Sequence, residues 1–298
     1  MQCFSPYYVK NQYTNTRGQN KVTPVPCGKC VTCKKRRARH WTFRLHQEAK
    51  QSKSVSFLTL TYKDKHLPKS KNGFATLDKK DFQLFMKKLR IECPKSNKQH
   101  RIKYYAVGEY GAEHHTTRPH YHAVMFNVPH KLIQSPLKIT EIWGKGRVDL
   151  EYPKNESKTT NYVTGYITKS TFERRDHIDT NTGLITADDR IAEFSLMSKG
   201  MGLSFLTDKM VKYFKDRKIF VIQGSGGELI SMPRYYKQKI FTPTELSAMY
   251  EEYINLQDEN IEQEINDIGR EYFRRQNEQI KALLRKTKKE NNLKRLKL

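Results

Sequence analysis

The chain of 298 residues could hold one large domain or two modest ones, but only 36% of it is hydrophobic, so we expect the core to occupy part of the length. Its 56 lysines and arginines against 31 aspartates and glutamates leave a formal charge of +25, which favours a polyanionic partner such as nucleic acid, although an AT-biased genome would also enrich lysine. No run approaches the roughly 18 apolar residues of a membrane-spanning helix, so we expect no membrane contact.

The first part of the chain, residues 1–50, is basic and carries four of the five cysteines. It lacks the basic-then-apolar pattern of a signal peptide, so we expect a cytoplasmic protein, in which disulfides are rare. Three cysteines are spaced three residues apart: Cys27, Cys30 and Cys33. A fourth ligand from Cys3, His40 or His46 would complete a closed structural zinc site. Reduced free cysteines, or an iron–sulfur or redox role, remain alternatives.

The basic run from Lys34 to Arg44 is expected to lie on a helix with Trp41. Such a helix face could follow a DNA backbone, and Trp41 could stack on an unpaired base. The same tryptophan could equally anchor the helix in the core.

Residues 51–225 have the strand and helix patterns of a mixed domain. We expect strands at 55–62, 102–107, around His120 and at 147–150, and helices at about 78–92, 132–143 and 158–170. The turn after residue 107 is short enough for the second and third strands to pair as an antiparallel hairpin. The pattern predicts an α+β fold, a central antiparallel sheet with helices packed on one side.

His120 and His122 lie two residues apart in an alternating segment, so both should point from the same face of a strand. Neutral imidazole is a common ligand of divalent metals, and Glu109 at the end of the preceding strand could reach the same face. Nitrogen and carboxylate donors with open positions favour Mg²⁺ or Mn²⁺. The alternative is a chance pair of histidines on a solvated strand. His114 and His115, in the intervening turn, are expected to face DNA or to have no role.

The predicted helix at 158–170 places Tyr162, Tyr166 and Lys169 on one face, at positions i, i+4 and i+7. A tyrosine oxygen can attack a phosphodiester and form a covalent phosphotyrosine. A nearby lysine can offset the anionic charge or protonate the leaving oxygen. Tyrosines at this spacing are also ordinary packing residues of amphipathic helices.

The last part of the chain, residues 226–298, is expected to form a charged helical extension. Thr242, Pro243 and Glu245 have the pattern of a helix start. Residues 242–269 contain no lysine or arginine, whereas residues 281–298 contain eight of them against a single glutamate. The basic end could bind DNA or another protein, or the helix could simply be solvated.

Three ordered motifs resemble those of HUH endonucleases: Phe57–Tyr62, Arg118–His122 and the Tyr162/Tyr166/Lys169 set. The paired tyrosines are similar to those of rolling-circle initiators with two tyrosines. Further segments resemble the replication initiation proteins of microviruses of the gokushovirus type: Pro26–Cys30 with Trp41 and Arg44, Val107–Gly111 and Phe194–Ser198. The resemblance spans residues 3 to about 236.

The resemblance implies a metal-dependent nickase and joiner of single-stranded DNA at a replication origin, in the cytoplasm of a host bacterium. Tyr162 and Tyr166 would be alternating nucleophiles supported by Lys169, and His120 and His122 would hold the metal, with Glu109 as a third ligand. A host helicase and polymerase would be partners, since the chain has no Walker-type loop. The alternatives are a non-enzymatic zinc-containing nucleic-acid-binding protein, and a transposase or relaxase with a single tyrosine. The oligomeric state cannot be inferred from the sequence.

Overall fold

A computed structural model describes residues 3–14, 20–93, 101–111, 118–151, 176–178, 183–224 and 227–252, with isolated positions between 271 and 285. The chain divides into two compact units. Unit 1 comprises Met1–Arg36, Leu206–Ile222 and Leu229–Leu298, and unit 2 comprises Arg37–Phe205 and Gln223–Glu228. The division into residues 1–50, 51–225 and 226–298 stays a prediction.

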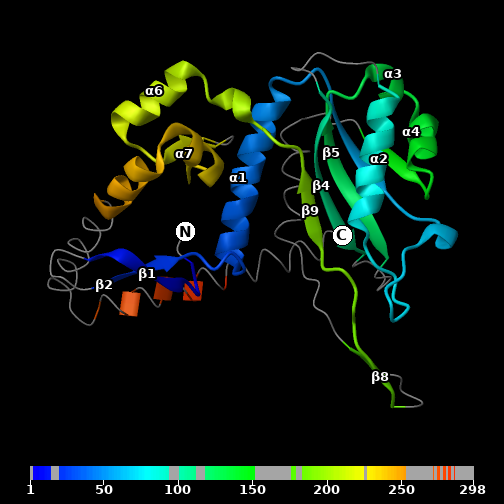
Figure 1. Cartoon of the computed structure of the whole chain (residues 1–298), viewed down its shortest axis with the longest axis horizontal. Coiled ribbons are helices and arrows are strands. Elements are labelled where there is room, and N and C mark those ends of the chain that lie inside the picture. Colours follow the sequence, from blue (N-terminus) through cyan, green and yellow to red (C-terminus); the bar gives the residue numbers. More distant parts are fainter. Residues whose placement is uncertain are drawn as a thin grey trace. The chain divides into compact units, whose positions relative to one another are not determined.

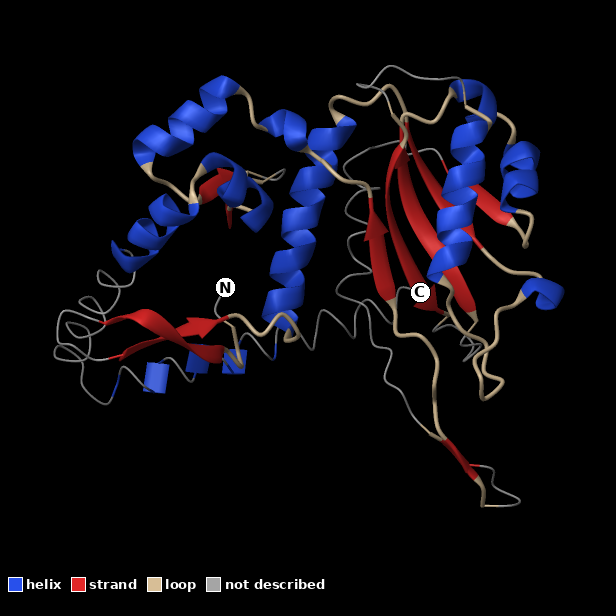
Figure 2. Cartoon of the chain, viewed as in Figure 1, coloured by secondary structure: helices blue, strands red, loops and turns tan. Residues whose placement is uncertain are grey.

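Unit 2 is built on a five-stranded sheet with the strand order β6–β3–β5–β4–β9 (Figures 1 and 2). Its strands are β3 (Val55–Leu60), β4 (Lys103–Tyr110), β5 (Pro119–Phe126), β6 (Val148–Glu151) and β9 (Phe194–Met197). All four neighbouring pairs are antiparallel, which confirms the predicted α+β fold. β5 lies at the centre with both faces covered, which explains its apolar run at Ala123–Phe126.

One face of the sheet is covered by helix α2 (Lys79–Ile91) together with α4 (Pro136–Trp143), as Figure 1 shows. The apolar residues of α2 recur at helical spacing and are all buried: Phe82, Phe85, Met86 and Leu89. Asp78 caps the helix, because its side chain accepts a hydrogen bond from the Lys80 amide at 2.8 Å. The helix predicted at 78–92 is therefore confirmed.

The opposite face of the sheet is covered in part by helix α1 (Val31–Ala49). Leu45 of α1 packs in a buried cluster with Tyr105, Val124 and Phe126 of the sheet. The Trp41 ring lies 4.8 Å from that of Tyr105, so this tryptophan packs on the sheet. The sequence analysis predicted helices on one side of the sheet only. It did not predict α1 as a second layer because the many basic residues of this helix outnumber the few apolar ones that face the sheet.

A single helix was predicted at 132–143, but the structure contains two separate helices in this region. α3 (His130–Ile133) ends before Ser135, and α4 begins at Pro136. Ser135 has φ −121° and ψ 77°, outside the helical region, as expected for a residue before proline. A proline at the first position of α4 costs no hydrogen bond there.

Unit 1 contains a hairpin of β1 (Tyr7–Thr14) and β2 (Asn20–Val25), which the sequence analysis did not predict. It also contains helix α6 (Asp208–Arg217), helix α7 (Arg234–Ile240) and a pair of short strands, β10 (Val221–Gln223) and β11 (Leu229–Ser231). Only the last residue of β10 belongs to unit 2. Residues 243–252 are helical, and the predicted start is confirmed by reciprocal hydrogen bonds between Thr242 and Glu245.

The remaining described elements are short. They are the 3-10 turns η1 (Asp64–His66) and η4 (Leu203–Phe205) and the strand pair β7 (His177–Ile178) and β8 (Ile185–Thr186). The helix predicted at 158–170 and most of the extension beyond residue 252 lie outside the described residues. Within the described part, no helix combines the length and the apolar character needed to cross a membrane.

Candidate functional site

Glu109, His120 and His122 lie together on two neighbouring strands of the central sheet. β4 and β5 pair in the antiparallel register that makes Glu109 the direct partner of His120, and Val107 that of His122. Direct partners in an antiparallel pair point to the same face, and so do residues i and i+2 of one strand. The predicted hairpin and the predicted common face of the two histidines are confirmed.

The side chains of these three residues converge on one point. The Nε2 atoms of His120 and His122 lie 3.1 Å and 3.3 Å from the same Oε1 atom of Glu109. One potential ligand atom from each residue lies within 4.8 Å of the other two. The two imidazole rings stand at 87° to each other with centroids 4.9 Å apart. The arrangement gathers two nitrogen donors and one oxygen donor around a common centre.

The other nitrogen of each histidine is also held. His120 Nδ1 lies 3.1 Å from the Arg118 carbonyl, and His122 Nδ1 lies 3.0 Å from the Thr59 hydroxyl. A carbonyl only accepts hydrogen bonds, so Nδ1 of His120 carries the proton and Nε2 faces the centre. The ring of Phe57 stacks on that of His122, with centroids 5.5 Å apart. Both imidazoles are therefore fixed in orientation before any ligand binds.

The close contacts change the protonation of Glu109 and His120. Burial disfavours the carboxylate, but the hydrogen bonds from His120 and His122 outweigh it, and the pKa of Glu109 is lowered. Burial likewise disfavours the imidazolium, but the hydrogen bond to the Glu109 carboxylate raises the pKa of His120. Without a metal, these hydrogen bonds between the imidazoles and the Glu109 carboxylate hold the centre together.

Tyr121, between the two histidines, points to the opposite face and anchors the strand there. Its hydroxyl donates a hydrogen bond of 2.6 Å to the Asp78 carbonyl and lies 2.8 Å from the hydroxyl of Tyr62. Tyr62 in turn donates to Asp81 at 2.8 Å, and Lys145 pairs with Asp81 at 2.9 Å. This buried network joins β5 to α2 and so fixes the position of the histidine strand.

The donor set fits a divalent cation that prefers nitrogen and oxygen ligands. Two imidazoles and one carboxylate, with Nδ1–H of His120 bonded to a carbonyl, are the common arrangement of metal-binding histidines. All three side chains keep some exposure, between 11% and 17%. A substrate oxygen could therefore reach an ion held there, as Mg²⁺ or Mn²⁺ sites require.

The structure brings together the predicted metal ligands but does not describe the predicted nucleophiles. Tyr162, Tyr166 and Lys169, as well as His114 and His115, lie outside the described residues. In unit 1, the structure gathers Cys3, Cys27, Cys30 and Cys33, whose sulfur atoms all lie within 4.8 Å of one another. Cys93 packs against the core beside α2, and burial raises its pKa to about 11.

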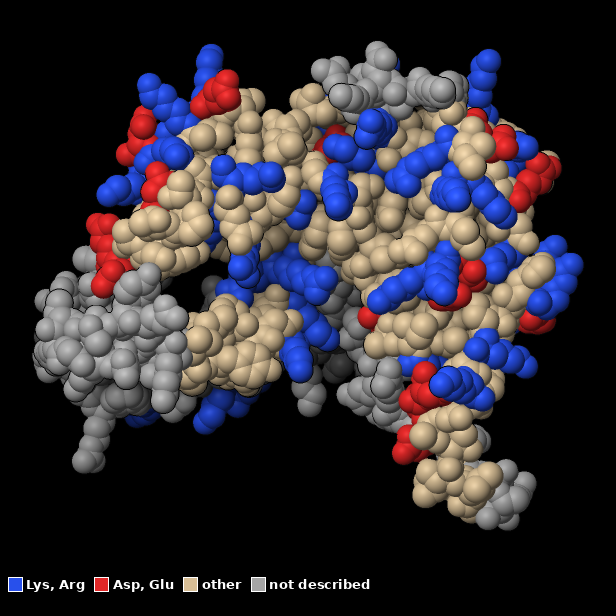
Figure 3. Space-filling model, viewed as in Figure 1, with Lys and Arg blue, Asp and Glu red and all other residues tan. Residues whose placement is uncertain are grey.

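The surface of the protein carries many lysine and arginine side chains. Figure 3 shows lysine and arginine side chains across the visible face and gathered over the first half of α1. This half of the helix contains the run Lys34–Arg39, of which Arg37 and Arg39 are exposed. A basic helix of this kind is suited to phosphate contacts.

The sequence analysis placed Thr59 and Arg118 in motifs but assigned neither a role in the site. Thr59 is the register partner of His122 and orients its ring. Arg118 supplies the carbonyl for His120 and binds Asp64 and the Tyr62 carbonyl through its guanidinium, at 2.6 Å and 2.7 Å. Thr59 and Thr61 place hydroxyls at alternating positions of the segment 55–62. This alternation is the signal that could have identified Thr59.

Comparison with known proteins shows that part of the chain is similar to replication-associated proteins. Residues 55–171, which include Glu109, His120 and His122, match the model of a family of replication-associated proteins of the ORF2 type. No solved structure matches the chain significantly.

Particular relatives come from three viruses. The replication-associated protein ORF2 of Spiroplasma virus 4 is 29% identical over 229 residues, which cover 72% of this chain and 67% of that protein. The replication-associated protein VP4 of Bdellovibrio phage phiMH2K is 37% identical over 105 residues, 34% of this chain and 31% of that protein. The replication-associated protein ORF4 of Chlamydia phage 1 is 26% identical over 234 residues, 72% of this chain and 53% of that protein. These matches confirm the resemblance to microvirus replication proteins.

Proposed function

We propose that the protein initiates replication of a small single-stranded DNA genome by cutting one strand at the origin and later rejoining it. The observation that carries the proposal is the convergence of His120 and His122 Nε2 on one oxygen of Glu109, at 3.1 Å and 3.3 Å. The similarity to replication-associated proteins supports the role in DNA replication. The formal charge of +25 supports a DNA substrate.

The cutting step assigned to the tyrosines balances as a transesterification. The hydroxyl oxygen of Tyr162 or Tyr166 attacks the scissile phosphorus, and its proton leaves to solvent or to a nearby base. The bond from phosphorus to the 3′ oxygen breaks, and that oxygen takes up a proton to become a free 3′ hydroxyl. The products are a 5′-phosphotyrosine and a 3′ end that a host polymerase can extend, so no other reactant is consumed.

Joining reverses this chemistry with the second tyrosine. After one round of synthesis the free tyrosine attacks the regenerated origin and releases a new 3′ hydroxyl. That hydroxyl attacks the first phosphotyrosine, which frees the tyrosine and closes a circular genome. Lys169, three residues after Tyr166 in the sequence, would offset the phosphate charge in both steps.

Glu109, His120 and His122 would hold a Mg²⁺ or Mn²⁺ ion in this scheme. A bound ion would supply Lewis-acid polarisation of the phosphate and charge stabilisation. The protein's own part is to fix both imidazoles through the Arg118 carbonyl and the Thr59 hydroxyl and to leave the centre open on one side.

The test is formation of a covalent adduct. The full chain is incubated with Mn²⁺ and single-stranded oligonucleotides that tile the origin region of its genome, and then run on a denaturing gel. We expect one oligonucleotide to give a protein–DNA adduct that is absent when EDTA replaces Mn²⁺. Absence of an adduct with every oligonucleotide would leave the non-enzymatic DNA-binding protein as the better reading. An adduct that a single tyrosine variant abolishes would favour the single-tyrosine relaxase or transposase.

Changing Thr59 to valine should weaken binding of Mn²⁺ at the site. The substitution keeps the shape of the side chain but removes the hydroxyl that orients His122. Loss of such an outer hydrogen bond weakens metal binding by about 10-fold to 100-fold. Calorimetric titration of Mn²⁺ into the chain measures the change. The matched control is Thr61→Val, whose hydroxyl binds the Arg147 carbonyl instead, and its affinity should stay unchanged.

Binding of Mn²⁺ should weaken as the pH falls through the raised pKa of His120. The metal replaces the proton on Nε2, so below this pKa each pH unit should lower the affinity by about tenfold. The stability of the metal-free chain should instead have two opposing dependences on pH. A raised histidine pKa stabilises the fold at low pH and this stabilisation disappears above that pKa, whereas the lowered pKa of Glu109 stabilises it until the pH falls through that pKa. Melting temperatures with EDTA and with Mn²⁺, measured across pH, would separate the two trends. Parallel curves would contradict the assigned ligands.

A further inference from the structure

The four cysteines of unit 1 come from segments that are distant in the sequence. Cys3 precedes strand β1, Cys27 and Cys30 follow strand β2, and Cys33 lies in the first turn of α1. The antiparallel pairing of Tyr7 with Val25 brings the beginning of β1 next to the end of β2. The hairpin therefore delivers Cys3 to the loop that carries Cys27 and Cys30.

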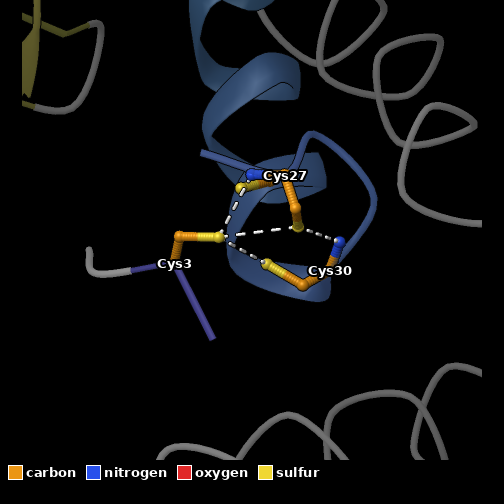
Figure 4. A group of neighbouring side chains, drawn as sticks. Cys3, Cys27 and Cys30 are labelled. Atoms are coloured by element: carbon orange, nitrogen blue, oxygen red, sulfur yellow. Dashed lines mark hydrogen bonds between the residues drawn. The ribbon is translucent and has the colours of Figure 1, made fainter. Parts of the chain in front are cut away.

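The sulfur atoms are arranged as ligands of one ion and not as disulfides. Sγ of Cys3 lies 3.5 Å from that of Cys27 and 3.8 Å from that of Cys30, and Figure 4 shows it directed toward both. A disulfide would bring two sulfurs to about 2.05 Å. A tetrahedral zinc with bonds of about 2.3 Å places its sulfurs about 3.8 Å apart. The observed separations match the second geometry.

Hydrogen bonds to the sulfur atoms also support metal binding by these cysteines. The Cys27 amide donates to Sγ of Cys3 and the Cys30 amide to Sγ of Cys27, both at 3.3 Å. The hydroxyl of Thr32 lies 3.1 Å from Sγ of Cys30, and the Arg36 guanidinium lies 3.7 Å from Sγ of Cys33. Amide and cationic donors aimed at sulfur stabilise thiolates, the form in which cysteine binds metals.

From these observations we propose that Cys3, Cys27, Cys30 and Cys33 bind one structural Zn²⁺ ion that joins the β1–β2 hairpin to the start of α1. This site is separate from the Glu109/His120/His122 centre in both its residues and its ligand type. Four protein ligands would close the coordination sphere, which makes the ion structural and not catalytic.

The hairpin needs such a connection because its own side chains provide little core. The described side chains at positions 7–9, 24 and 25 are all exposed, among them Tyr7 at 55% and Tyr8 at 68%. A two-stranded hairpin is at best marginally stable alone in water. Small elements without a core are commonly held by disulfides or metals, and here the cysteines are free and gathered.

The ion would also stabilise the start of α1. The first turn of this helix has no acidic residue, and basic residues follow at once, beginning with Lys34 and Lys35. Positive side chains are unfavourable beside the positive end of a helix dipole. One Zn²⁺ with four thiolates carries a net charge of about −2, which would offset both the basic side chains and the positive end of the helix dipole. The zinc site would thus allow a strongly basic helix to begin where it does.

Metal analysis of the full chain tests the proposal. A background variant, Glu109→Ala/His120→Ala/His122→Ala, removes the other metal centre of the described residues. After purification it should retain about one zinc per chain by native mass spectrometry and elemental analysis. Adding Cys3→Ser or Cys33→Ser should reduce zinc retention at least about tenfold. The matched control, Cys93→Ser, alters the one cysteine outside the cluster and should leave zinc retention unchanged.

Two further measurements do not depend on the folding of the cysteine variants. When Co²⁺ replaces zinc in the background variant, we expect the intense visible bands and thiolate charge-transfer absorption of a tetrahedral tetrathiolate site. Chelation should increase hydrogen exchange in β1 and β2 and leave the β3–β5 strands protected. Zinc retained in both cysteine variants, Co²⁺ without thiolate bands, or iron in place of zinc would overturn the proposal.

Discussion

The double variant Tyr162→Phe/Tyr166→Phe should form no covalent adduct with any origin oligonucleotide. The phenol oxygen is the atom that bonds to phosphorus in the proposed reaction, and phenylalanine keeps the ring while removing that atom. Each single variant should still form an adduct, because the remaining tyrosine can take the place of the first. The readout is the amount of labelled oligonucleotide that stays with the protein on a denaturing gel.

The single variants should nevertheless fail in joining. Release of a closed circle needs a second nucleophile while the first is still bound to the 5′ phosphate, so one tyrosine supports cutting but not a complete cycle. Tyr213→Phe, on the exposed side of α6, serves as the control and should behave as the unaltered chain. Mapping of the adducted peptide by mass spectrometry should locate the DNA on residue 162 or 166. An adduct at another tyrosine would disprove the assignment.

Replacing His120 or His122 with alanine should lower cleavage by about a hundredfold or more, the range expected when a preorganised group that stabilises transition-state charge is lost. Each substitution removes one of two nitrogens that lie within 3.3 Å of Glu109 Oε1. Binding of the same oligonucleotide should change much less, because most of the DNA affinity comes from lysine and arginine contacts with phosphates.

Single-turnover cleavage with Mn²⁺ and fluorescence anisotropy with EDTA separate the two effects. His130→Ala is the matched control, since His130 is exposed at the start of α3, away from the cluster. Equal losses of binding and cleavage in the His120 and His122 variants would contradict a role in holding the metal. Cleavage that persists in both would place the metal elsewhere.

Local patterns were enough to predict several parts of this protein. The alternation around His120 and His122 placed both on one strand face, and the spacing of Phe82, Phe85, Met86 and Leu89 predicted α2. The Thr242–Glu245 pattern predicted a helix start. Each of these features depends on residues within a few positions of one another, where backbone geometry alone decides which side chains share a face.

Other features could not be read in this way. Ser135 and Pro136 interrupt a helix that the apolar pattern made continuous, because the restriction on the residue before proline outweighs helical periodicity. The helix α1 packs on the second face of the sheet through Leu45 and Trp41, although its composition is dominated by positive charge. Here a few buried contacts decide the packing, and composition does not reveal them.

The sequence by itself determined that the chain is strongly basic, and it supplied the candidate residues for binding a metal and for attacking a phosphate. The tertiary structure decided which of the candidate donors meet. Glu109 reaches His120 through the β4–β5 register, and Thr59 reaches His122 from a strand 63 residues away. Of the three candidates for the fourth ligand beside Cys27, Cys30 and Cys33, the structure places Cys3 there, across a hairpin. Such choices depend on strand register and on packing between distant segments, which local patterns leave open.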